Sequence, residues 1–164
     1  TGKARYLRVR DLRKQMWMIR SSSSLPLVSK TIVVKGHKLL DGGIADSIPI
    51  HRSIEDGNEK NVVILTRDEE YRKEPNKLMP LMRLRYPKYK EFLQAMETRH
   101  IRYNEVLDFL EEQEREGKVF VIRPQAKVEV GRVEKDKAKL TVLYKQGVHD
   151  GEQAIEAMKE YLEK

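Results

Sequence analysis

The sequence predicts an α/β fold with a mostly parallel sheet, followed by a mainly helical C-terminal region. Two runs of consecutive apolar residues carry this prediction, "NVVILT" at 61–66 and "KVFVIRP" at 118–124. Uninterrupted apolar, β-branched runs of this length are typical of strands buried on both faces, as in a parallel sheet. Strand and helix patterns also alternate along the first half of the chain, which is the order found in α/β proteins.

The N-terminal segment begins with alternating residues. The stretch "KARYLRV" at 3–9 alternates polar and apolar side chains and predicts a half-buried strand. Asp11 then stands where it can cap a helix over 12–20. The apolar stripe of this helix consists of Leu12, Met16 and Ile19. Trp17 lies on the same helix, and we expect it in the core.

Short elements follow the serine run at 21–24, which ends the helix because serine hydroxyls compete for backbone hydrogen bonds. The stretch at 31–36 predicts a strand and a turn, and 38–43 predicts a short strand that ends in a tight turn. A short helix is expected over 48–55, closed by Gly57.

The chain divides in the sequence at residue 77, into a core over 1–77 and a mainly helical extension over 78–164, with one strand near 118–123. Within 78–116 an apolar helix face is formed by Phe92, Met96, Tyr103, Leu107 and Leu110. The tail at 136–164 predicts two helices, broken between Gly147 and Gly151.

Composition excludes several classes of protein. The chain has 164 residues and no Cys, which excludes a disulfide scaffold, a thiol nucleophile and Cys-ligated metal. No apolar run approaches the roughly 18–20 residues that a membrane span needs, and no signal peptide opens the chain. We therefore expect a cytoplasmic protein, with peripheral contact to a membrane left open. Because the chain starts at Thr1 inside an expected strand, we expect it to be part of a longer polypeptide.

Positive charge is concentrated in the first 40 residues, which hold ten Lys and Arg and one acid, within a chain of net charge +7. Most of it is carried by Arg5, Arg8, Arg10, Arg13, Lys14 and Arg20. Three interpretations stay open: a face that is solvated or packs against acidic residues of the remaining protein, a surface for anionic lipid, and a nucleic-acid surface. No nucleic-acid motif is present, so we do not expect nucleic acid as the partner.

Familiar catalytic motifs are absent: the sequence has no G-x-S-x-G elbow, no Walker A loop and no H-E-x-x-H. The histidines at 37, 51, 100 and 149 are not spaced as metal ligands, and we expect His100, between Arg99 and Arg102, on a helix surface. No residue calls for a metal or an organic cofactor.

The strongest local feature is "LLDGGIADSIP" at 39–49, where Asp41 ends an apolar strand and Gly42 and Gly43 follow. Functional carboxylates cluster at the ends of strands in α/β proteins, and one placed here could act as a general base. Asp-Gly is also a common turn, so this motif alone leaves a purely structural role open. Asp46, five residues later, is interpreted as a helix N-cap.

Read in order, "SSSSLPL" at 21–27, "LLDGGIADSIPI" at 39–50 and "NVVILTR" at 61–67 resemble the C-terminal half of a patatin-like phospholipase. The downstream segments "RDEEYRKEP" and "RHIRYNEVLDFLEEQEREGKVFVIRP" resemble the C-terminal extension of a bacterial subgroup of that family. The resemblance spans nearly the whole chain but only about half of such a protein. It implies a three-layer fold with a mostly parallel sheet.

The resemblance implies a lipid acyl hydrolase that cleaves phospholipid or lysophospholipid esters with a Ser-Asp dyad. Asp41 would be the base and Gly42 and Gly43 would complete the motif. The nucleophilic serine would lie in the missing N-terminal half, since no serine of this chain has the flanking glycines of an elbow. We therefore expect the full-length protein to be a serine esterase and this chain alone to be inactive.

The alternative is a non-catalytic binding module that holds an anionic surface, membrane or nucleic acid, through the basic segment 1–40. Such a module would bind in a salt-dependent manner without any further part of the protein.

Overall fold

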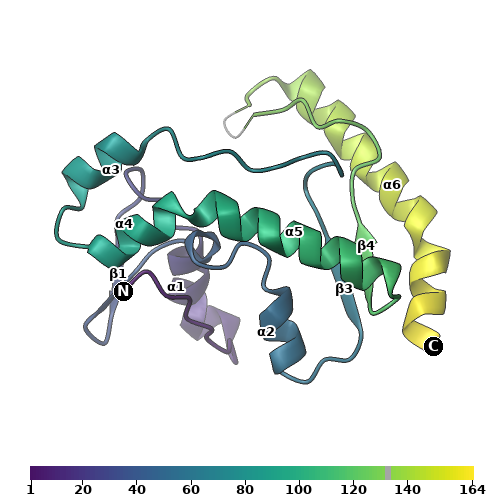
Figure 1. Cartoon of the computed structure of the whole chain (residues 1–164), viewed down its shortest axis with the longest axis horizontal. Helices are drawn as coiled ribbons and strands as arrows, with labels where there is room; N and C mark the ends of the chain where they lie inside the picture. Colours follow the sequence, from purple (N-terminus) through teal and green to yellow (C-terminus); the bar gives the residue numbers. More distant parts are fainter. Residues whose placement is uncertain (132–133) are drawn as a thin grey trace. The chain divides into compact units, whose positions relative to one another are not determined.

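The computed structural model describes residues 1–131 and 134–164, and about half of the chain is helical (Figure 1). The helices are α1 (Leu12–Ser22), α2 (Ile50–Glu55), α3 (Met79–Arg85), α4 (Lys90–Glu97), α5 (Arg99–Arg115) and α6 (Lys137–Glu163), with a short 3-10 helix η1 (Gly42–Ile44). The strands are β1 (Ile32–Val34), β2 (His37–Leu39), β3 (Asn61–Ile64) and β4 (Val119–Ile122). The predicted combination of helices and strands is confirmed; within the described residues the strands form an antiparallel pair, β1–β2, and a parallel pair, β3–β4.

The chain forms two compact units. Unit 1 comprises Thr1–Pro49 and Lys73–Glu105, and unit 2 comprises Ile50–Arg72 and Val106–Lys164. Each unit therefore contains two separate stretches of the sequence, and each is described here by itself.

In unit 1, the two short strands expected at 31–36 and 38–43 are present as β1 and β2, and they form an antiparallel hairpin rather than part of a parallel sheet. Ile32 pairs with Leu39 and Val34 with His37. The turn between them consists of Lys35 at φ 47° and Gly36 at φ 77°. Positive φ at both central residues is the geometry of the type I′ turn, whose twist matches that of a two-stranded hairpin.

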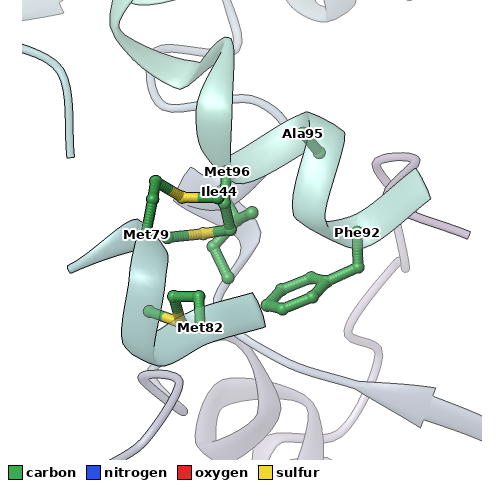
Figure 2. Packing of buried hydrophobic residues seen from close by; sticks show 6 residues of the cluster. All are labelled: Ile44, Met79, Met82, Phe92, Ala95 and Met96. Atoms are coloured by element: carbon green, nitrogen blue, oxygen red, sulfur yellow. The ribbon is translucent and has the colours of Figure 1, made fainter. Parts of the chain in front are cut away.

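The core of unit 1 lies where α3 and α4 cover η1. Its buried side chains are Ile44, Met79, Met82, Phe92, Ala95 and Met96 (Figure 2). The ring of Tyr86 packs edge-on against Phe92, with centroids 5.1 Å apart. Ile44 is the last residue of η1, so burial of its side chain among these methionines anchors the loop that begins at Asp41.

In unit 2, β3 and β4 form a parallel pair, as their continuous apolar runs predict, with Asn61 opposite Val119 and Ile64 opposite Ile122. Tyr161 on α6 lies between the two strand starts. Its hydroxyl donates to the Lys118 carbonyl at 2.7 Å and accepts from the Asn61 N–H at 3.0 Å. The prediction that these strands are buried on both faces is wrong at Ile64 of β3, whose side chain is 71% exposed.

Two predicted elements are wrong. Residues 3–9 form no strand, because no neighbouring segment of the described chain pairs with them, and alternation alone does not stabilise an isolated strand. The tail is one continuous helix, α6, that runs through Gly147 and Gly151. Each glycine costs about 1 kcal/mol relative to alanine, and the packing of α6 on β4 offsets that cost.

Other helix predictions hold in part. Asp11 caps α1, and its carboxylate accepts from the Arg13 and Lys14 N–H groups. The apolar stripe of that helix is exposed rather than buried, at 55% for Leu12, 52% for Met16 and 42% for Ile19. Trp17 is half-buried. The single helix face expected over 78–116 is divided between α4 and α5, so Phe92 and Met96 pack in unit 1, and Leu107 and Leu110 are buried in unit 2.

Among the residues that the structure describes, no helix has both the length and the apolar character needed to cross a membrane.

Candidate functional site

The candidate site is the loop that follows β2 in unit 1. Asp41 lies two residues after the end of β2 and is the N-cap of η1. Its N–H donates to the Ser24 carbonyl at 2.9 Å, and its Oδ1 accepts from the Gly43 N–H at 2.7 Å. Asp41 is half-buried, and it follows β2 rather than forming part of the turn at Lys35 and Gly36. Backbone hydrogen bonds before and after Asp41 thus fix the position of its carboxylate.

The serine run lies against this loop. Ser21 and Ser24 are buried, and each hydroxyl donates at 2.7 Å to the carbonyl four residues earlier, at the end of α1. A Cβ placed on Gly42 would lie 3.3 Å from the Oγ of Ser22. The sequence relates the serine run and the Asp-Gly-Gly motif only by their order, and the structure brings them into contact.

Arg99, at the start of α5, holds the glycine turn from the other side. Its Nε donates to the Gly43 carbonyl at 2.6 Å, and its Nη2 lies 3.5 Å from the Oγ of Ser47. The Ser47 hydroxyl itself donates to the same Gly43 carbonyl at 2.6 Å. The Gly43 carbonyl therefore accepts two hydrogen bonds, one from Ser47 and one from Arg99, two residues that are 52 positions apart in the sequence.

Arg102, one turn further along α5, binds three backbone carbonyls. Its Nη1 donates to Ala45 at 3.0 Å, and its Nη2 donates to Ile44 at 3.1 Å and to Ala95 at 2.6 Å. Charge-assisted hydrogen bonds contribute about 1.5–3 kcal/mol each. The Nε of Arg102 is buried and has no hydrogen-bond partner in the described chain. Arg102 therefore ties η1 to α4 through its terminal nitrogens alone.

Gly43 is the point at which the polar groups of the site meet. A Cβ at this position would lie 3.1 Å from Asp41 Oδ1 and 3.5 Å from Arg99 Nη2. A contact of 3.1 Å is tighter than carbon and oxygen normally make, so a side chain here would displace the carboxylate. The absence of a side chain at Gly43 thus allows the Asp41 carboxylate to accept the hydrogen bond from the Gly43 N–H.

The Asp41 carboxylate remains chemically available. In residues 1–131 and 134–164 its hydrogen bond is the one from Gly43 N–H, and no Lys or Arg forms an ion pair with it. A half-buried carboxylate with a free Oδ2 can accept a proton from a hydroxyl placed beside it. No serine hydroxyl in this part of the chain donates to it; the nearby Ser47 donates to Gly43 instead.

Asp46 has a different role from the one predicted. Its Oδ2 accepts a hydrogen bond from the Tyr6 hydroxyl at 2.5 Å. Interpretation as a helix N-cap is wrong, because α2 begins at Ile50, four residues further on, which is beyond the reach of a cap. Asp46 therefore ties the N-terminal segment to the loop.

The two arginines are the residues that sequence reasoning missed. Arg99 and Arg102 stand in "RHIR", where they were interpreted only as neighbours of His100 on a helix surface. His100 is half-buried, and its Nδ1 lies 3.0 Å from the Glu97 carbonyl. Arg99 and Arg102 are three residues apart and therefore lie on the same face of α5. This spacing is the one feature of the sequence that could have indicated a shared role. Nothing local indicates that backbone carbonyls lie opposite them.

The histidines do not gather at a metal site. Among the described residues, no group of three or more His, Asp or Glu side chains is arranged to hold a metal ion. The His51 ring packs on Phe109 in unit 2, with centroids 4.3 Å apart.

Comparison with known proteins identifies one family model, which describes a domain of unknown function (DUF6363) and matches residues 89–163. The match covers less than half of the chain, from α4 to α6, and includes Arg99 and Arg102 but not Asp41. No curated protein and no solved structure matches the chain. Similarity to this domain therefore identifies a recurring C-terminal segment and assigns no activity to it.

Proposed function

We propose that this chain is part of a patatin-like lipid acyl hydrolase in which Asp41 is the general base of a Ser-Asp dyad. The observation that carries the proposal is the half-buried Asp41 carboxylate, held on a Gly-Gly turn by the Gly43 N–H and free of ion pairs in the described chain. Arg99 and Arg102 hold the backbone of this turn through the carbonyls of Gly43, Ile44 and Ala45. The rigid support suits a base that must meet a hydroxyl at a fixed distance.

In the proposed reaction, the serine Oγ attacks the ester carbonyl carbon while Asp41 accepts the hydroxyl proton. The carbon–oxygen bond to the alcohol then breaks, and the alcohol leaves with that proton, giving an acyl-enzyme. Water attacks the acyl carbon and loses a proton to Asp41. The bond between the acyl carbon and the serine Oγ then breaks, Asp41 returns that proton to the Oγ, and the fatty acid is released. A carboxylate that acts directly as the base removes the need for a histidine.

The nucleophile of this scheme belongs to a part of the protein outside these 164 residues. Two exposed surfaces support a larger α/β domain. The stripe of Leu12, Met16 and Ile19 on α1 is open to solvent. The parallel pair β3–β4 has Ile64 71% exposed, whereas parallel sheets are normally covered on both faces. A three-layer patatin fold would cover both surfaces.

The test is ester hydrolysis by the longer protein that contains this chain. We expect Asp41→Asn to lower kcat by about 10²–10⁴-fold, the range for loss of a positioned general base. Asp46→Asn is the matched control, because it changes a second carboxylate of the same loop that binds Tyr6; its activity should stay within a few-fold of wild type. Equal loss in both variants, or none in Asp41→Asn, would refute the assignment.

A second candidate function rests on the charge of the N-terminal segment. The side chains concerned are all exposed: Arg5, Arg8, Arg10, Arg13, Lys14 and Arg20. Such a surface suits a module that binds anionic lipid or nucleic acid without catalysis. Sedimentation with phosphatidylglycerol vesicles, but not phosphatidylcholine vesicles, by a protein that hydrolyses no ester would favour this candidate.

A further inference from the structure

A pocket of about 480 Å³ lies in unit 2, between α6 and the segment that follows β4. That segment runs beside α6 (Figure 1), and the Gln146 side chain bonds to Ala126 across the gap. The pocket is lined by Gln125, Ala126, Gln146, His149, Asp150, Gln153 and Ala154. Its size falls within the range of about 300–1,000 Å³ that is usual for small-ligand sites.

Asp150 supplies the only formal negative charge of the pocket lining. It sits in the middle of α6 and is 9% exposed. Its Oδ2 accepts from the Gln125 N–H at 3.2 Å, and no Lys, Arg or His of the described chain forms an ion pair with it. Burial of a carboxylate without a cation is unfavourable, and aspartate is a poor residue for a helix interior. One backbone N–H satisfies only part of the hydrogen-bonding capacity of this group.

Two of the lining glutamines, Gln125 and Gln146, use their amide nitrogens in hydrogen bonds to backbone carbonyls. Gln125 Nε2 donates to the Arg123 carbonyl at 3.3 Å, and Gln146 Nε2 donates to the Ala126 carbonyl at 3.2 Å. A backbone carbonyl only accepts, so these bonds fix which end of each amide is nitrogen. Both Oε1 atoms are left as acceptors. The acceptors of the lining thus include the Asp150 carboxylate and the amide oxygens of Gln125 and Gln146, beside the side chains of His149 and Gln153.

We propose that this pocket binds a small organic cation, an ammonium or guanidinium group on a short alkyl chain. The charged head would meet Asp150 and the amide oxygens, because cationic N–H groups form the strongest hydrogen bonds with such acceptors. The alkyl chain would lie on Ala126, Ala154 and the methylene groups of the glutamines. The proposal is independent of the proposed hydrolase activity, since Asp41 belongs to unit 1 and the pocket to unit 2.

The primary test compares two probes of nearly equal shape on the unaltered chain, n-butylguanidinium and the neutral N-butylurea. Amide NMR spectra follow each titration. We expect saturable shifts of the Gln125 backbone amide and the Gln146 side-chain amide with n-butylguanidinium only. Equal shifts with N-butylurea, or no saturable shift with n-butylguanidinium, would overturn the proposal. This comparison needs no variant, so it stands whether or not any variant folds.

Variants locate the charge that is responsible. Asp150→Asn keeps an acceptor for the Gln125 N–H and removes the charge, so we expect n-butylguanidinium to bind about 10- to 100-fold more weakly, as for a lost charge-assisted hydrogen bond. Glu152→Gln removes an exposed charge two residues away on the same helix and should change affinity less than about twofold, because exposed charges are screened. Equal weakening in both variants would show general electrostatic attraction and contradict a site at Asp150.

Discussion

In unit 1 guanidinium groups hold a loop in place, whereas in unit 2 a backbone ladder aligns two strands. Arg99 and Arg102 donate to four carbonyls. Three of them, at Gly43, Ile44 and Ala45, lie more than 50 residues away in the sequence, and the fourth, at Ala95, lies in the preceding helix α4. β3 and β4 instead share a parallel register, closed at its start by Tyr161. The comparison teaches that the candidate catalytic loop depends on a few specific side chains, while the strand pair depends on a repeated pattern.

The largest effect is expected from the apolar interior of unit 2. Leu110 on α5 is 1% exposed, and Leu110→Ala should lower the free energy of unfolding by about 3 kcal/mol, since a cavity remains. Urea denaturation followed by circular dichroism measures this. Ile155→Ala, at an exposed apolar position of α6 in the same unit (39% exposure), is the control and should cost less than about 1 kcal/mol. Equal losses would show that unit 2 has no tightly packed core.

In unit 1, a comparable loss in the free energy of unfolding is expected from Arg102, with its effect centred on the loop at η1. Arg102→Ala removes three charge-assisted hydrogen bonds. Their contributions are not additive within one side chain, and water replaces part of them in the variant, so the net loss should be about 2–3 kcal/mol. Arg102→Lys should recover only part of it, because one ammonium does not reproduce the planar guanidinium fork. Hydrogen exchange at the Ile44 and Ala45 amides should accelerate in both variants. Unchanged exchange there would show that Arg102 does not hold the loop.

The strand pair should be less sensitive to a single polar change. Tyr161→Phe removes the hydroxyl that joins Lys118 and Asn61, and we expect a loss of about 1–2 kcal/mol with the β3–β4 register retained. Thermal unfolding measures it. The exposed Tyr144 on the same helix provides the control, since Tyr144→Phe should leave the transition within about 0.5 kcal/mol. A large loss would mean that the ladder alone does not align the strands.

The smallest effect is a gain. A Cβ on Gly147 would meet no atom within 4 Å, and the residue lies inside α6. Gly147→Ala should therefore stabilise by about 0.5–1 kcal/mol through the helix propensity of alanine. Destabilisation would indicate that the helix breaks at this point, as the glycines alone suggest.

Prediction from the sequence succeeds where a pattern is repeated. The apolar runs of β3 and β4, the Asp11 cap and the Lys35–Gly36 turn all depend on neighbours within a few residues. Prediction fails where the local structure depends on a segment that is distant in the sequence. Residues 3–9 alternate like a strand but have no strand beside them in the described chain.

The candidate site shows the same division. Asp41 and its glycines are visible in the sequence because the Asp-Gly-Gly motif directly follows an apolar strand and stands in order with the serine run at 21–24 and the apolar run at 61–66. Arg99 and Arg102 are not visible, because an arginine on a helix is ordinarily solvated and its carbonyl partners lie in another segment. The Tyr6–Asp46 bond is hidden for the same reason, at a separation of 40 residues.

The most direct measurement is covalent labelling with a fluorophosphonate, which reacts with activated serines. Applied to the longer protein that contains this chain, it should label a single serine outside these 164 residues, and Asp41→Asn should abolish or greatly slow the labelling. The 164-residue chain alone should not react. A label on a serine within this chain, or a rate unaffected by Asp41→Asn, would contradict the assignment of Asp41 as the base.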